Sequence, residues 1–180
     1  MKDVKGTTRV CGIIGNPVGH SVSPVLQNTL ADITGTELVY VPFKVEDNIK
    51  AAIEGAYALN VFGLNVTVPH KSAVIECLAD IDPIAASIGA VNTLVRTDRG
   101  YKGYNTDILG LKRELEEAGI ALGGRRVIIL GAGGAATAIA VQAALDGVST
   151  LHIFNRKGRS WERALKLADT INANTCLLYT

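Results

Sequence analysis

Two segments of the sequence carry polar side chains suited to hold a small anionic molecule. Residues 15–24 (Gly-Asn-Pro-Val-Gly-His-Ser-Val-Ser-Pro) place Ser21 and Ser23 in a loop before a predicted helix. Their hydroxyls, together with the N–H groups of the helix N-terminus, suit a carboxylate. Residues 65–71 present Asn65 and Thr67 on one face of a predicted strand and Lys71 just beyond its carboxyl end. Ligands of open α/β sheets bind at that end, so these side chains are candidate binding residues.

Further polar residues follow other predicted elements. Asn92 stands at the start of one strand, Asn105 at the end of the next, and Asp107 at the start of the following helix. Each residue has a structural explanation when it is taken alone. Ser23 suits a helix cap, Lys71 suits a solvated surface, and Asp107 is favoured by the dipole of the first helical turn. Their gathering at one edge of a sheet favours a binding site.

A glycine-rich turn follows the apolar run 126–130. Gly131, Gly133 and Ala136 fit the G-x-G-x-x-A pattern of dinucleotide-binding βαβ units, in the required order of strand, turn and helix. In that pattern the first residue makes the tight turn, the second lets the backbone approach a pyrophosphate, and the third lets the helix pack on the strand. The alternative is a plain packing turn. The candidate cofactor-binding residues of this turn are Gly131, Ala132, Gly133, Gly134 and Ala135.

The loop after the next predicted strand indicates which dinucleotide binds. NAD-binding units place an acid about 20 residues beyond the glycines to bind the ribose 2′-hydroxyl, whereas cations suit a 2′-phosphate. Here the loop contains Asn155, Arg156, Lys157 and Arg159, and the first acid is Glu162. The sequence therefore favours NADP over NAD, although most short basic runs are simply solvated loops.

Alternating strand and helix signals must position these groups. Apolar runs predict buried strands at residues 10–14 and 126–130 and further strands at 38–43 and 150–154, and alternation with period 2 predicts a strand at 64–68. Helical spacing and caps predict helices at residues 23–33, 47–59, 107–118, 134–145 and 160–172, with Ser23 as the N-cap of the first. Two short helical stretches precede a hairpin formed by 92–97 and 101–105. We expect an α/β protein with a three-layer α/β domain at residues 1–122 and the first half of a Rossmann domain at 123–180.

The composition excludes several classes of protein. Hydrophobic residues make up 48% of the 180 residues, which is enough for a buried core and unlike a disordered chain. The net charge of +1 does not attract nucleic acid or an anionic membrane, and no apolar run of about 18 residues exists to span a bilayer. The three cysteines form no CxxC pair and have no histidine at ligand spacing. We expect a cytoplasmic protein that binds small molecules, without a metal, nucleic-acid or membrane partner; the oligomeric state stays open.

The order and spacing of the motifs resemble the shikimate dehydrogenase family. The motifs are G-N-P-x-x-H-S-x-S-P, N-V-T-V-P-x-K, G-A-V-N-T, N-T-D and G-A-G-G-A, and they lie within residues 10–156. The resemblance implies a substrate domain followed by an NADP-binding Rossmann domain. It implies that Ser21 and Ser23 bind the shikimate carboxylate, and that Lys71 and Asp107 form the catalytic pair. It also implies that the ring hydroxyls are held by Asn65, Thr67, Asn92 and Asp107.

The activity implied by the resemblance is the reversible, NADP-dependent reduction of 3-dehydroshikimate to shikimate, a step of chorismate and aromatic amino acid biosynthesis. A quinate/shikimate dehydrogenase is an alternative, because that subgroup resembles residues 155–174, with an acid where this chain has Gly158. A folate dehydrogenase or tRNA-linked reductase would explain the glycine turn but not the serine and lysine motifs. A binding-only fragment is a further alternative.

The end of the chain departs from the family pattern. The Rossmann strand order 3-2-1-4-5-6 requires strands for which this sequence has no segment, since it ends where a third strand would begin. We therefore expect a C-terminally truncated and inactive chain. Residues 176–180 (Cys-Leu-Leu-Tyr-Thr) also match one reading frame of a common sequencing adapter, so they are either an artefact or the native third strand.

Overall fold

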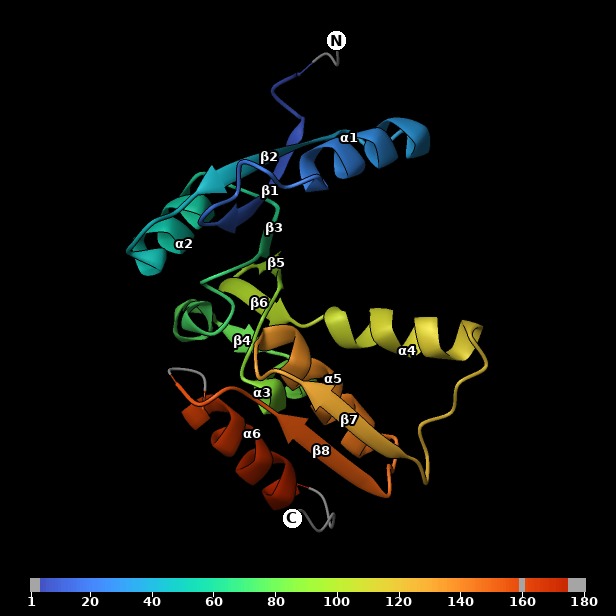
Figure 1. The fold of residues 1–180 in the computed structure, drawn as a ribbon. Coiled ribbons are helices and arrows are strands. Elements are labelled where there is room, and N and C mark those ends of the chain that lie inside the picture. Colours follow the sequence, from blue (N-terminus) through green and yellow to red (C-terminus); the bar gives the residue numbers. More distant parts are fainter. Residues whose placement is uncertain (1–3, 159–160, 175–180) are drawn as a thin grey trace. The chain divides into compact units, whose positions relative to one another are not determined.

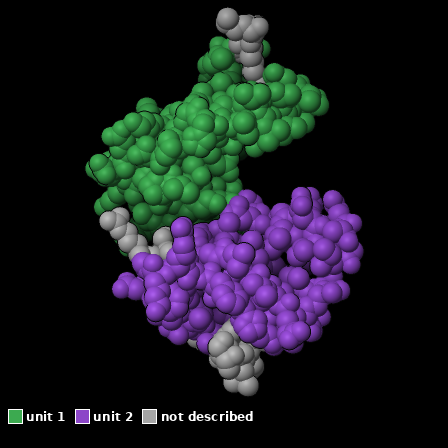
Figure 2. Space-filling model, viewed as in Figure 1, with its two compact units in different colours: residues 1–105 green, residues 106–180 purple. Residues whose placement is uncertain are grey.

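The computed structural model describes residues 4–158 and 161–174 and confirms the predicted α/β class (Figure 1). Its contacts divide the chain into two compact units, Met1–Asn105 and Thr106–Thr180, which Figure 2 colours separately. Within the described part of the chain, no helix is long and apolar enough to cross a bilayer.

The first unit is built on a sheet of six strands in the order β2-β1-β3-β5-β6-β4. These strands are β1 (Arg9–Gly15), β2 (Leu38–Lys44), β3 (Gly63–Val66), β4 (Asp80–Ile81), β5 (Thr93–Thr97) and β6 (Gly100–Tyr104). Strands β2, β1 and β3 run parallel, and β5 and β6 form the predicted antiparallel hairpin. The sequence does not predict β4, because a two-residue strand is too short to show alternation.

Side-chain alternation along the strands gives the first unit a layer on each face of its sheet. Neighbouring residues of a strand point to opposite faces, so Ile14 and Ile13 belong to different apolar clusters. The Ile14 cluster includes Ile53 of α2 (Ile49–Ala58) and Val74 of the 3₁₀ helix η1 (Ala73–Cys77). Helix α1 (Ser23–Thr34) packs against β1 and β2, and the short α3 (Pro83–Ile88) packs against β6. The predicted three-layer arrangement is confirmed.

The start of helix α1 differs from the sequence prediction. Ser23 is not the N-cap: that position is Val22, whose φ of −83° and ψ of −9° are already helical, and no side chain caps the helix. Ser23 is therefore the first helical residue, and its N–H donates to the Ser21 hydroxyl oxygen at 3.3 Å. The helix ends, as predicted, at Gly35, which adopts the left-handed conformation with φ of 65°.

The second unit contains β7 (Arg126–Leu130) and β8 (Thr150–Phe154), which pair in parallel, and the helices α4 (Asp107–Glu117), α5 (Gly134–Leu145) and α6 (Trp161–Asn174). Helix α5 packs against both strands and against α4 and α6. The prediction of β7 as a buried strand is wrong: Ile129 is buried, but Ile128 and Leu130 are 63% and 81% exposed. Among the described residues β7 pairs only with β8, and α5 is the helix that packs against it.

The compact units divide between Asn105 and Thr106, whereas the sequence predicts a domain boundary at Gly123. The difference is helix α4, which packs against α5 and so groups with the second unit. Residues 118–125, which include Gly123, still form the connection between α4 and β7. The domain boundary at Gly123 stays a prediction.

Candidate active site

The carboxyl ends of β1 and β3 bring the first two sequence motifs together. The Asn16 N–H donates to the Val68 carbonyl, and the Thr67 N–H donates to the Ile14 carbonyl, both at 2.9 Å. The contact is close because β1 ends in a glycine: a Cβ on Gly15 would lie 2.4 Å from the Thr67 Cγ2 atom. The loop that carries Ser21 therefore starts directly beside the Thr67 side chain.

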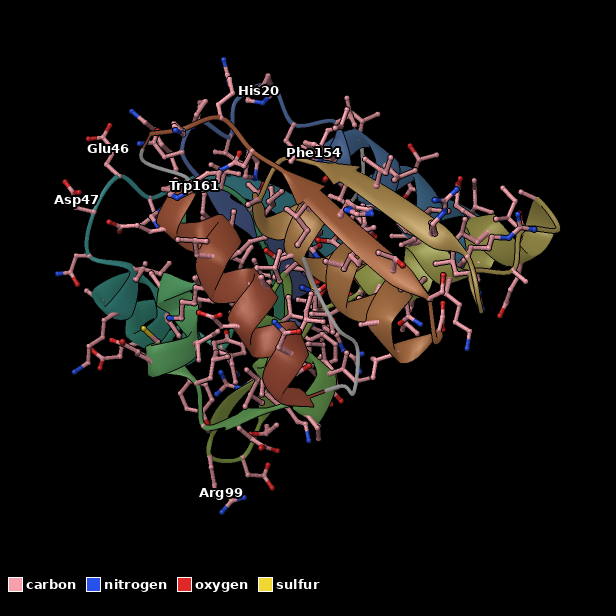
Figure 3. The ribbon with its side chains drawn as sticks, turned by 60° about the horizontal axis from the view of Figure 1, so that its bottom comes forward. His20, Glu46, Asp47, Arg99, Phe154 and Trp161 are labelled. Atoms are coloured by element: carbon pink, nitrogen blue, oxygen red, sulfur yellow. The ribbon has the colours of Figure 1, made fainter. Side chains whose placement is uncertain are left out.

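The serine loop holds its hydroxyls at the start of α1. Ser21 and Ser23 are both half-buried, and the Ser21 N–H donates to the Val18 carbonyl at 3.1 Å. His20, labelled in Figure 3, precedes them on an exposed stretch of the same loop. The two hydroxyls and the first turn of a twelve-residue helix can donate hydrogen bonds to a carboxylate.

Asn65 of β3 is held by a hydrogen-bond network that the sequence does not reveal. Its Oδ1 atom accepts from the Tyr40 hydroxyl at 2.7 Å, and its Nδ2 atom donates to the Asn92 carbonyl at 3.3 Å and to the Thr93 hydroxyl at 3.2 Å. Burial raises the pKa of Tyr40 to about 12, so its phenol stays protonated. In the sequence, Tyr40 was the one residue that could have indicated this network, since a buried tyrosine hydroxyl needs a hydrogen-bond partner.

Two further asparagines, both predicted from the sequence as candidates, are buried at the ends of β5 and β6. Asn92 donates its N–H to the Tyr104 carbonyl at 3.0 Å, and its Oδ1 accepts from the Thr93 hydroxyl at 2.9 Å. Asn105 donates from Nδ2 to the Ala90 carbonyl at 3.0 Å. The structure thus brings Asn65 and Asn92 into one network and uses Asn105 to hold the chain before β5.

Lys71 follows β3, and hydrogen bonds fix both its own main chain and the preceding residue. Its carbonyl accepts from the Val91 N–H at 2.8 Å. The preceding His70 is buried, and its Nε2 lies 2.7 Å from the Val45 carbonyl. Val45 in turn donates its N–H to the Gly15 carbonyl at 3.2 Å. These bonds join the ends of β1, β2 and β3, and His70 is a participant that the sequence reasoning missed.

Asp107 occupies the first turn of α4, at the start of the second unit. It lies two residues beyond Asn105 in the sequence, so the chain connects it directly to the asparagine-bearing end of β6. Its pairing with Lys71 stays a prediction.

The second unit contains a backbone turn that fits a dinucleotide. Gly131 follows β7 with φ of 110°, a conformation that side chains rarely adopt, and α5 begins at Gly134. A Cβ on Gly131 or Gly133 would meet no atom within 4 Å, so the backbone there faces open space. Ala132 is buried, whereas Gly133, Gly134 and Ala135 are exposed at the helix N-terminus.

The basic loop lies beside this turn. The Gly131 N–H donates to the Phe154 carbonyl at 2.8 Å, and Phe154, labelled in Figure 3, is the last residue of β8. Asn155 follows half-buried, and Arg156 and Lys157 are exposed. Arg159 lies outside the described residues, as do residues 175–180. The described part of the loop therefore places two cations just after the strand end that contacts the glycine turn.

Among residues 4–158 and 161–174, no cluster of His, Cys, Asp and Glu could hold a metal ion.

Comparison with known proteins bears on the first unit most directly. Residues 13–94 match the shikimate dehydrogenase substrate binding domain. The chain is similar to proteins of the shikimate dehydrogenase family. The match contains the serine loop, the β3 motif and Asn92.

Relatives of the shikimate dehydrogenase family match both units. The shikimate dehydrogenase (NADP⁺) of Methanothermobacter thermautotrophicus is 51% identical over 85% of this chain and 54% of its own length. Shikimate 5-dehydrogenase from Listeria monocytogenes, solved with shikimate and NAD, has a TM-score of 0.93 and 40% identity, over 100% of this chain and 63% of its own.

A shikimate dehydrogenase solved with NADP⁺ has a TM-score of 0.88 and 39% identity, over 98% of this chain and 60% of its own. The chain spans 54–59% of the length of the curated relatives that it matches.

Proposed function

We propose that the protein containing this chain catalyses the reversible, NADP-dependent reduction of 3-dehydroshikimate to shikimate. The observation that carries the proposal is the meeting of the serine loop with β3 at the Gly15–Thr67 contact. It puts hydroxyls suited to a carboxylate next to amide and hydroxyl groups suited to a polyol. The named activity of the relatives supports the same assignment. We also propose a cytoplasmic location.

The substrate is bound by the polar residues that the sequence predicts. Ser21 and Ser23 hold the carboxylate, because their hydroxyls stand at the N-terminus of α1, where the helix dipole favours an anion. The ring hydroxyls are held by Asn65, Thr67, Asn92 and Asp107. Among these, Asn65 and Asn92 share one hydrogen-bond network, which gives the polyol site a fixed geometry.

The second unit fits NADP. The N–H groups at the start of α5 suit the pyrophosphate, and the backbone there leaves open space for it. Arg156 and Lys157 suit a 2′-phosphate, with Asn155 and Arg159 as the further predicted residues of the loop. A carboxylate in the same place would repel that phosphate, and the described part of the loop contains none.

Lys71 and Asp107 carry the proton chemistry. When bound, the reduced cofactor supplies the hydride that the carbonyl carbon accepts. The Lys71 ammonium stabilises the negative charge that develops on the carbonyl oxygen and donates a proton to it. In the reverse direction the neutral amine removes the proton from the substrate hydroxyl. Asp107 holds the ammonium in position through its opposite charge.

The test is shikimate oxidation by the full-length protein, followed by absorbance of the reduced nicotinamide with NADP and, in parallel, with NAD. Lys71→Ala should lower kcat by about 10² to 10⁴ with little change in KM for NADP, because the proton donor is lost. The matched control is Lys50→Ala on α2, where the lysine is exposed and pairs only loosely, at 3.8 Å, with Glu54.

A Lys71→Ala enzyme within about threefold of the parent kcat, or about 0.6 kcal/mol, would remove Lys71 from the mechanism. Absence of shikimate oxidation by the parent would refute the proposed function itself. Turnover of quinate in preference to shikimate would reassign the substrate.

A further inference from the structure

We propose that Tyr40 positions the Asn65 amide so that the site accepts a hydroxyl at Asn65 and rejects a carbonyl there. Tyr40 is the third residue of β2 and lies two strands from Asn65 in the order β2-β1-β3. Its phenol reaches across β1 to the Asn65 Oδ1 atom. The proposal rests on the proposed function, in which Asn65 holds a ring hydroxyl, and it adds the polarity of that contact and the residue that sets it.

The neighbours of Asn65 determine which way its amide points. The Asn92 carbonyl can only accept, so the atom 3.3 Å from it must be the Asn65 nitrogen. The Thr93 hydroxyl donates to the Asn92 side chain and therefore accepts from the same nitrogen at 3.2 Å. Both Nδ2 hydrogens are thus used within the protein, and Oδ1 is the atom that faces Tyr40.

The Tyr40 hydroxyl is fixed as a hydrogen-bond donor, and the Tyr40 backbone is fixed in position. The phenol must donate, because Oδ1 has no hydrogen, and burial keeps the phenol protonated by raising its pKa. The Asn28 side chain of α1 fixes the Tyr40 backbone on both sides, accepting from its N–H at 3.0 Å and donating to its carbonyl at 2.8 Å. Helix α1 therefore anchors the tyrosine that orients the substrate-facing asparagine.

Towards a substrate, Asn65 can therefore act only as a hydrogen-bond acceptor. With both N–H groups used and one lone pair of Oδ1 taken by Tyr40, Asn65 retains one lone pair, which can only accept. A substrate hydroxyl satisfies that lone pair. A carbonyl oxygen in its place would set two acceptors against each other and leave both without a donor, which a site built for a hydroxyl rejects strongly.

The experiment compares Tyr40→Phe with Tyr101→Phe in the full-length protein. Tyr101 is also a buried tyrosine, and its hydroxyl donates to the Val61 carbonyl at 2.6 Å, away from Asn65. Both variants lose one phenol hydrogen bond, so a structural cost applies to both. Tyr40→Phe should raise KM for shikimate about tenfold with kcat within about threefold, whereas Tyr101→Phe should leave both constants unchanged.

Substrate analogues test the polarity. A set of shikimate analogues, each with one ring hydroxyl replaced by hydrogen or by a keto oxygen, should contain one position where the parent loses affinity and Tyr40→Phe loses much less. Equal losses in the parent and in Tyr40→Phe at every position would overturn the proposal. An equal rise of KM in Tyr40→Phe and Tyr101→Phe would also overturn it, because the effect would then be structural.

A measurement that needs no turnover separates this inference from the proposed function. The two side-chain amide protons of Asn65, observed by nuclear magnetic resonance, should be distinct and protected from exchange in the parent and in Tyr101→Phe. They should lose that protection in Tyr40→Phe. If the Asn65 amide protons lose protection in Tyr40→Phe but the parent protein does not oxidise shikimate, the proposed function fails and the positioning role stands. Unchanged protection in Tyr40→Phe would refute the positioning role.

Discussion

Replacement of Gly15 by alanine tests the contact that joins the serine loop to the end of β3. A Cβ at Gly15 would lie 2.4 Å from the Thr67 Cγ2 atom and 3.2 Å from the Val68 carbonyl oxygen. The first distance is far below van der Waals contact, and the second atom belongs to the backbone, so β1 or the end of β3 must shift. Overpacking of this kind costs about 1–3 kcal/mol. The smaller conformational entropy of unfolded alanine offsets about 0.4–1 kcal/mol.

We therefore expect Gly15→Ala to lower the free energy of unfolding by about 1–2 kcal/mol and the melting temperature by several degrees. Gly19→Ala in the same loop is the matched control, because a Cβ there meets nothing within 4 Å. The only tryptophan, Trp161, lies in the other unit. Hydrogen exchange of the β1 and β3 amides is therefore the better measure of the effect.

Removal of the opposing methyl group provides a second control. Thr67→Ser retains the hydroxyl but lacks Cγ2, so Gly15→Ala combined with Thr67→Ser should recover much of the lost stability. The reasoning is wrong if Gly15→Ala stays within about 0.5 kcal/mol of the parent, the range of ordinary surface substitutions. It is also wrong if Gly19→Ala costs as much as Gly15→Ala.

Further predictions concern the cofactor, the titration of a phenol, a helix cap and a strand edge. Arg156→Ala should weaken binding of NADP much more than binding of NAD in calorimetry, since only NADP has a 2′-phosphate; equal losses would assign Arg156 another role. The folded-state pKa of Tyr40, about 12, lies above its ordinary value of 10.0. Its contribution to stability is thus complete below pH 10 and is lost at about 1.4 kcal/mol per pH unit as the pH rises towards 12. Tyr40→Phe should flatten that part of an alkaline unfolding curve. Asp82→Ala should cost about 0.5–2 kcal/mol, because the Asp82 carboxylate accepts from two N–H groups at the start of α3, and Asp82→Asn should cost less. Ile128→Lys should reduce self-association of the 180-residue chain in sedimentation experiments, because Ile128 is 63% exposed on β7, a strand with an unpaired edge among the described residues.

Local patterns in the sequence were sufficient for the order of the elements and for the position of the polar motifs. The hairpin of β5 and β6 follows from the turn signal Asp98-Arg99-Gly100 between two short strand segments. The turn at Gly131 follows from glycine spacing between a strand and a helix. These features depend on residues a few positions apart, whose conformational preferences act wherever the chain lies. The same locality explains why Asn65 and Lys71 could be selected as site residues.

Short elements and exact helix starts could not be predicted in this way. Strand β4 has two residues, which is below the length at which alternation is visible. The N-cap of α1 lies at Val22 and not at Ser23, because the backbone is already helical at Val22 and Ser21 accepts the hydrogen bond from the first helical N–H. Neighbouring residues and tertiary contacts decide a cap among several acceptable positions.

The contacts that orient the site depend on the tertiary structure alone. The Tyr40 hydroxyl and the Asn65 side chain are 25 residues apart in the sequence, as are His70 and Val45. They meet because β2, β1 and β3 lie side by side in parallel, a register that the strand sequences do not specify individually. The sequence therefore determined which side chains are available at the sheet edge. Strand pairing decided which of them are held by hydrogen bonds within the protein, and so which atoms we expect to bind a ligand.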